Sequence, residues 1–110
     1  MATSLLQPQQ SAPLAATLTD IYTVGVGTSA VISTLKVCNR SATATTFRIA
    51  VRPDGDAIAN GHYQYYDVNI GGYDTFSATE GWTLTAGDVV SVYATDATLS
   101  FTLYGQEVTS

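Results

Sequence analysis

The chain has 110 residues, of which 45% are hydrophobic and only 12% are charged, and its formal net charge is −5. A chain of this length forms one domain with a real core, and its acidic balance lacks the basic surface that nucleic-acid binding requires. The single cysteine, Cys38, excludes an internal disulfide and a cysteine-built zinc site. Because no apolar run approaches the ~18 residues of a membrane span, we expect no membrane partner.

Residues 1–17 are expected to form an extended N-terminal arm outside the core. They contain Pro8 and Pro13 and show no regular hydrophobic period. Leu5 and Leu6 are the only strongly apolar pair in this segment. The segment is therefore interpreted either as a frayed terminus or as an arm that docks on a neighbouring subunit through these two leucines.

Short strands and turn signals alternate over residues 18–110, which are expected to form the folded domain. Thr, Val and Tyr are abundant there and favour a pleated, half-buried surface. Residues 45–52 alternate cleanly, with Phe47, Ile49 and Val51 on one side. Strands are expected at 19–24, 30–39, 45–52, 62–70, 73–78, 82–84, 89–95 and 99–104.

This pattern of about seven or eight short strands predicts an all-β fold, a single-domain antiparallel β-sandwich with little or no helix. The order of strands is left open, since jelly-roll-like and immunoglobulin-like connections give similar strand spacing. Cys38, next to Val37 in a strand, is expected to be a small buried hydrophobe. Alternation predicts a core of Val31, Leu35, Val37, Phe47, Ile49, Val51, Val90, Val92, Leu99, Phe101 and Leu103.

Few residues of the sequence are candidates for catalysis or metal binding. His62 is the only histidine, and no G-x-S-x-G segment supplies a nucleophile for it to activate. The acids lie mostly at turn positions, where Asp is favoured for its hydrogen bonds to nearby backbone N–H groups. The two carboxylates of the segment 53–56 are too few for a calcium site. We therefore expect no enzyme and no catalytic, cofactor-binding or metal-binding residues.

Arginine and tyrosine are grouped on two consecutive predicted strands. Arg48 and Arg52 share the outward side of one strand, and Tyr63, Tyr65 and Tyr66 lie on the next. These residue types anchor many protein interfaces. Three interpretations stay open: cross-strand packing within one chain, a subunit or capsid contact, and carbohydrate binding by exposed aromatic rings.

Several segments together resemble a family of small virion proteins of tailed bacteriophages, including phages of cyanobacteria. They are VCNR, TFRIAVRP, HYQYYDV, LTAGDVVSVYA and LSFTLYGQE, and the resemblance covers residues 18–110. Related segments also resemble parts of phage tail fibres and tailspikes. The resemblance implies a β-sandwich that assembles, commonly as a trimer, and reinforces a virion.

The family further implies a capsid cement, or decoration, protein. Such a protein lies on the outer capsid surface and bridges subunits of the phage major capsid protein, which would be its partner together with its own copies. It would be made in the host cytoplasm and need no cofactor. The alternative is a tail-associated or fibre-tip module that binds the host surface.

Overall fold

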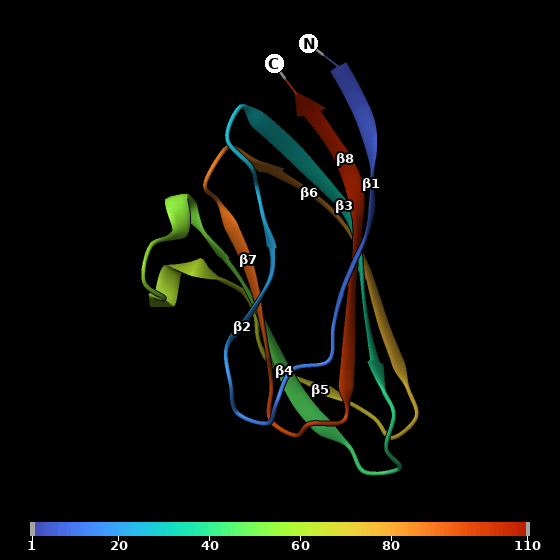
Figure 1. Cartoon of the computed structure of the whole chain (residues 1–110). Helices are drawn as coiled ribbons and strands as arrows, with labels where there is room; N and C mark the ends of the chain where they lie inside the picture. The colour runs from blue at the N-terminus through green and yellow to red at the C-terminus, as the bar shows by residue number, and fades with distance from the viewer. Residues whose placement is uncertain (1, 110) are drawn as a thin grey trace.

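The computed structural model describes residues 2–109 as eight strands in two antiparallel sheets that pack face to face (Figure 1). The predicted fold class is confirmed. The strands are β1 (Ala2–Ser11), β2 (Thr19–Thr23), β3 (Thr28–Asn39), β4 (Thr45–Arg52), β5 (Tyr63–Ile70), β6 (Thr75–Leu84), β7 (Val89–Ala94) and β8 (Leu99–Thr109).

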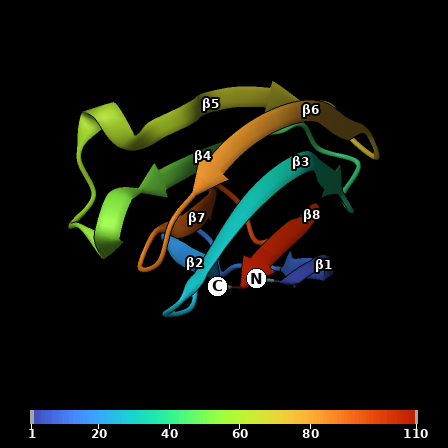
Figure 2. The ribbon, with the colours of Figure 1, turned by 90° about the horizontal axis from the view of Figure 1, so that it is seen from above.

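Strand order identifies the sandwich as a jelly roll. One sheet, sheet A, has the order β1-β8-β3-β6, and the other, sheet B, has the order β2-β7-β4-β5. Consecutive pairs such as β1 and β2 lie in different sheets, so the chain crosses repeatedly between the layers, as in the double Greek key of a jelly roll. Figure 2 shows β5 and β6 along one side of the sandwich and β1 and β2 along the other.

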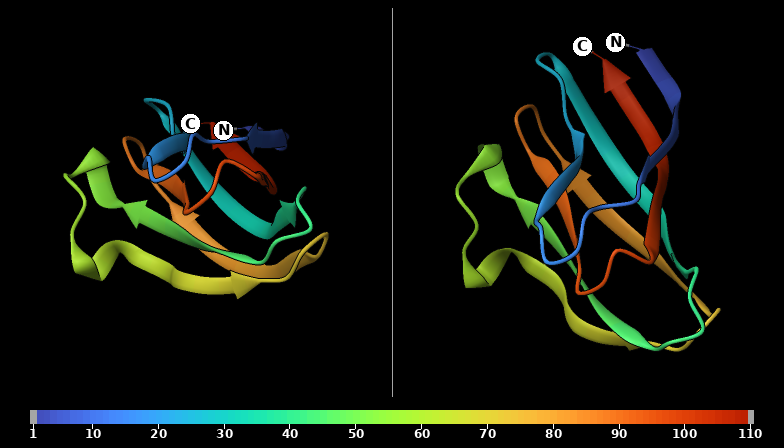
Figure 3. Two further views of the ribbon diagram at one scale, coloured as in Figure 1. Left: turned by 90° about the horizontal axis from the view of Figure 1, so that it is seen from below. Right: turned by 60° about the horizontal axis from the view of Figure 1, so that its bottom comes forward.

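Helical structure within residues 2–109 is limited to two single 3-10 turns, η1 (Pro53–Gly55) and η2 (Asn60–His62). Both lie in the segment between β4 and β5, which projects to one side of the sandwich (Figure 3). In the turn at Pro53–Gly55, Asp54 and Gly55 adopt positive φ angles. Across residues 2–109, no helix is long and apolar enough to cross a bilayer.

The core fills the space between the sheets and is contributed by alternate residues of the inner strands. Phe47, Leu35, Val92 and Phe101 are among its fully buried members. Most of the predicted core is confirmed, and Val51 is half-buried at its margin. Other hydrophobic residues are buried as well, although they were not predicted to be in the core: Tyr22, Val24, Ala30, Ile32, Ala50, Ile70, Leu84, Val89 and Ala94.

Two residues of β3 point the opposite way from the prediction. Val31 is 39% exposed, and Ile32 is buried in its place. The reason is a register shift between Ile32 and Thr34, which adds one residue to the alternation of β3. Cys38 is exposed rather than buried, because Val37 takes the inward position before it.

The expected N-terminal arm lies largely within the sandwich. Its residues 2–11 form β1, which pairs antiparallel with β8 at the edge of sheet A. Without β1, the backbone N–H and C=O groups along one edge of β8 would be unpaired. β1 supplies their hydrogen-bond partners. Pro8 is tolerated because it falls at a register shift between Leu6 and Gln9, on a strand whose other side is free.

Candidate interaction surfaces

The outward side of sheet A is almost free of charge. Strand alternation and the pairing register place Ser, Thr and other neutral side chains along it, and Lys36 is the one charged residue among them. We call this surface the neutral face. Its members are Thr3, Leu5, Gln10, Ser29, Val31, Ser33, Lys36, Cys38, Thr75, Ser77, Thr79, Thr83, Ser100, Thr102, Tyr104, Gln106 and Val108.

A hollow of about 490 Å³ lies in the neutral face and is lined by apolar and uncharged groups. Gly105 lines it and leaves no room for a side chain, because a Cβ there would meet the Val31 carbonyl oxygen at 2.1 Å. The registers of β1 and β3 against β8 both shift at the level of Gly105, and such bulges bend a sheet. The remaining lining is Leu5, Leu6, Val31, Ser33, Tyr104 and Gln106.

The outward side of sheet B carries the predicted Arg–Tyr group. The Arg48 guanidinium lies 4.2 Å from the ring centre of Tyr66 and 4.6 Å from that of Tyr93. Its Nε donates to Asp67 Oδ1 at 2.7 Å, and the hydrogen bond raises the pKa of Arg48. Tyr63 packs edge-on against Tyr66 with ring centres 5.0 Å apart. The structure therefore brings Arg48, Tyr63 and Tyr66 together.

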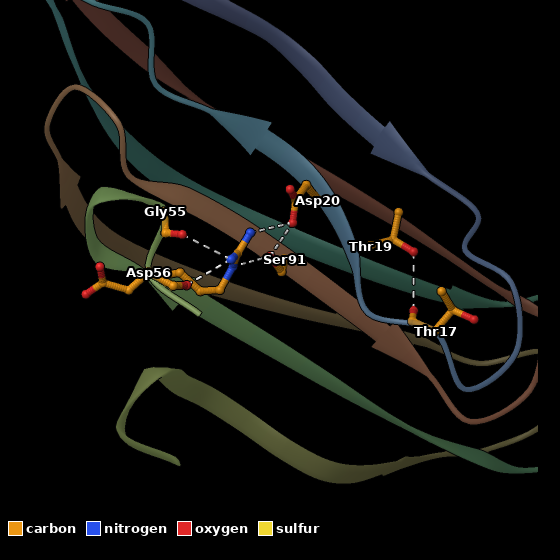
Figure 4. Close-up of polar contacts among 7 residues, drawn as sticks. Thr17, Thr19, Asp20, Gly55, Asp56 and Ser91 are labelled. Carbon is orange, nitrogen blue, oxygen red and sulfur yellow. Dashed lines mark hydrogen bonds and ion pairs between the residues drawn. The ribbon is translucent and has the colours of Figure 1, made fainter. Parts of the chain in front are cut away.

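Arg52 lies on the same side but is engaged by its own chain. Its partners Asp20, Gly55, Asp56 and Ser91 are labelled in Figure 4. Its Nη2 donates to Asp20 Oδ1 at 2.8 Å, and its Nε donates to Ser91 Oγ at 3.1 Å. Nη1 donates to the carbonyl oxygens of Gly55 and Asp56, which fixes the turn after β4. The Arg52 side chain is only 15% exposed. Its bonds to Asp20 and Ser91 connect β2, β4 and β7 within a single chain.

Tyr65 is separated from the other tyrosines. It points between the sheets, where its ring lies edge-on to Phe76 at 5.5 Å and its hydroxyl donates to Glu80. Tyr65 and Tyr66 are consecutive residues of β5 and therefore point to opposite sides of the strand. Asp67, with a φ of +50°, lies at the register shift between Tyr65 and Val68. Burial and the Glu80 hydrogen bond raise the pKa of Tyr65 to about 12.

An equivalent tyrosine–carboxylate pair closes the other side of the sandwich. The Tyr22 hydroxyl of β2 donates to Glu107 Oε2 of β8 at 2.5 Å. Burial, and after it the hydrogen bond that Tyr22 donates to Glu107, raises the pKa of Tyr22 well above its ordinary value. These two pairs tie sheet A to sheet B along opposite sides, and Glu80 and Glu107 have structural roles there.

The two leucines of the N-terminal segment differ in environment. Leu5 is 81% exposed on β1, whereas Leu6 is partly buried against the core. Sequence reasoning did not select Tyr93 or Tyr104 as contact residues, and it assigned Val31 to the core. Only strand pairing shows that Tyr104 lies near Leu5 and Val31.

His62 and Asp88, which have ionisable side chains, have local structural roles. His62 Nδ1 accepts a hydrogen bond from the Ala59 backbone N–H and stabilises η2. Asp88 accepts hydrogen bonds from the backbone N–H groups of Asp54 and Thr85, which outweigh burial and lower the pKa of Asp88. Within residues 2–109 no group of three or more His, Cys, Asp or Glu side chains is placed to hold a metal ion.

No known protein family and no curated protein matches this sequence. Among solved structures, two of a phage capsid protein are similar to this chain. Two crystal structures of a pentameric capsid protein isolated from metagenomic phage sequences share 18% sequence identity with this chain, with TM-scores of 0.31 and 0.30. The matches cover 97% of this chain, which spans 61% and 67% of those two chains.

Proposed function

We propose that this chain is a structural protein of a phage virion, without catalytic activity, that acts as a capsid cement protein. In this role it assembles as a homo-oligomer, a trimer by its family resemblance, on the outer surface of the capsid. There it bridges subunits of the major capsid protein and resists the internal pressure of the packaged DNA.

The composition of the neutral face is the observation that carries this proposal. A four-stranded sheet whose outward positions contain one charged residue, Lys36, differs from the usual solvated face of a sandwich, which is rich in charge. Groups that become buried against protein lose water, and neutral hydroxyl and amide groups lose it at lower cost than charged groups. The face therefore suits permanent contact with protein.

The family resemblance supplies the virion context. Its motifs fall on five strands of the fold. VCNR covers the end of β3, TFRIAVRP covers most of β4, HYQYYDV begins at His62 and continues into β5, LTAGDVVSVYA contains β7, and LSFTLYGQE lies in β8. The same elements contribute the core residues Val37, Phe47 and Phe101. The resemblance thus runs along the framework of the jelly roll rather than through one loop.

Heating of particles tests the cement function. Virions from which the protein has been removed are expected to release DNA at a lower temperature than intact virions. Adding the purified protein back is expected to restore the higher temperature. Equal DNA release from stripped and intact particles would contradict a cement function.

A tail-associated module that binds the host surface is the second candidate. It is favoured by Tyr66, which is 57% exposed beside Arg48 and Asp67. An exposed ring with neighbouring polar groups can stack on a sugar and hydrogen-bond its hydroxyls. A glycan array comparing the wild type with Tyr66→Ala tests this candidate, and binding that is lost in the variant would support it.

A further inference from the structure

The neutral face offers the surface through which an acidic chain can meet its own copies. The chain carries nine acidic residues against four basic ones, so random approach of two copies is opposed by their charge. On the neutral face no acidic residue occupies an outward position in the residues that the structure describes. Two such faces can pack together without an unpaired carboxylate between them.

The half of the neutral face nearest the two described chain ends is also the most apolar. Leu5 is 81% exposed and Val31 is 39% exposed, Gln106 of β8 pairs with both, and Tyr104 lines the same hollow. Lys36 is five residues along β3 from Val31, or about 16 Å, and its Nζ lies 5.9 Å from the ring centre of Tyr104. Leu5 and Val31 therefore lie away from the one charge of the neutral face, which borders the apolar half at Tyr104.

The size of the face matches what an interface requires. Four strands spaced about 4.8 Å apart, each about 34 Å long for ten residues, give a planar area of roughly 650 Å². A standard protein interface buries about 800 Å² on each partner. The neutral face alone therefore supplies most of that area. The planar estimate does not include the extra surface of protruding side chains or of residues around the edge of the face.

The free edge of β1 is continuous with this half of the face. Residues 2–11 contain no charged side chain, although edge strands of soluble proteins are usually protected by charge, proline or a bulge. Pro8 protects the middle of β1, and the Gln9 side chain donates to the Gln7 carbonyl at 2.9 Å. The part that includes Leu5 lacks such protection, so the uncharged surface continues around the edge.

We propose that copies of this chain contact one another through the neutral face of sheet A, with Leu5 and Val31 at the centre of the contact. This inference rests on the homo-oligomer of the proposed function and assigns its surface. It places the contact on sheet A, whereas the Arg48 and Tyr66 group of sheet B stays outside it.

Light scattering coupled to size exclusion tests the surface with matched variants. Val31→Asp and Leu5→Asp place a carboxylate at the centre of the contact, and both positions are exposed enough to keep the fold. Ile58→Asp is the control, because Ile58 is also 39% exposed but lies on the segment between β4 and β5. Circular dichroism and thermal unfolding verify that each variant is folded.

The wild type and Ile58→Asp are expected to show the same multiple of the 11.6 kDa chain mass, and the two neutral-face variants are expected to fall to one chain mass. A wild type that is monomeric at all concentrations would overturn the inference. So would folded Val31→Asp and Leu5→Asp variants that keep the wild-type mass, or a control that dissociates equally.

Particle binding separates this inference from the proposed function. If the wild type is monomeric but Val31→Asp no longer binds stripped particles, the neutral face contacts the capsid, and the self-contact is wrong while the virion function stands. If the variants dissociate as expected but the wild type binds no particle, the self-contact is supported and the cement function fails.

Discussion

Truncation of Phe47 to alanine should remove a large part of the stability of this domain. Phe47 is fully buried at the centre of β4, and its ring centre lies 5.3 Å from Phe76, 6.1 Å from Phe101 and 6.4 Å from Tyr65. It therefore joins both sheets. Phe→Ala in a core costs about 3–5 kcal/mol, and each aromatic pair contributes about 0.5–1.5 kcal/mol beyond burial.

We expect the cost to lie in the upper part of that range, at about 4–5 kcal/mol, since several ring contacts are lost at once. Native domains are stable by only about 5–15 kcal/mol, so Phe47→Ala approaches complete unfolding. At about 4 °C or more per kcal/mol, the melting temperature should fall by at least about 15 °C. Urea unfolding monitored by Trp82, the single tryptophan, measures the change.

Tyr73→Ala is the matched control for aromatic truncation. Tyr73 is 75% exposed in the turn before β6, so its loss should change the unfolding free energy by less than about 0.5 kcal/mol. A Phe47→Ala variant that loses less than about 1.5 kcal/mol, with an unchanged denaturant slope, would refute the inward register of β4.

Other substitutions test the bend in sheet A, the turns and the seam between the sheets. Gly105→Ala should cost about 1–3 kcal/mol, because its Cβ would meet a backbone carbonyl oxygen at 2.1 Å; unchanged urea unfolding would count against the bend. Asn39→Ala removes two hydrogen bonds that the buried Asn39 side chain donates to the carbonyl oxygens of Thr43 and Gly71 and should cost about 1–3 kcal/mol in the same assay, whereas a neutral effect would contradict their stabilising role. The pKa of Tyr65 is raised from 10.0 to about 12, so the folded state binds its proton more tightly, and this stability is lost as pH rises from 10 to 12. Thermal unfolding across that range should therefore decline less steeply in Tyr65→Phe, and parallel declines would contradict the Tyr65–Glu80 hydrogen bond.

Local alternation predicted most of the strands because their inward and outward residues differ clearly. The strand at Thr45–Arg52 was predicted with its observed bounds, and its buried residues Phe47 and Ile49 are confirmed. The prediction of Val31 as a core residue was wrong, because a β-bulge reverses the alternation and single-strand patterns do not reveal bulges. Tyr65 packs inward, away from Tyr66, because consecutive residues of a strand point to opposite sides.

Long-range pairing was beyond the reach of the sequence pattern. β1 lacks a hydrophobic period and contains Pro8, and it forms a strand because the edge of β8, a distant segment, is available to pair with it. The jelly-roll order depends on similar pairings between β3 and β8 and between β4 and β7. The neutral face emerges only when those pairings place Leu5, Val31 and Tyr104 side by side. Composition had indicated a surface poor in charge, but not which side of which sheet carries it.

Electron cryo-microscopy of intact virions that contain this chain tests its virion role most directly. We predict jelly-roll density over the junctions between major capsid subunits, repeated across the whole outer capsid surface. Within each cluster of copies, the neutral face should lie against protein. Density confined to the tail, or its absence from the particle, would contradict the assignment as a capsid cement protein.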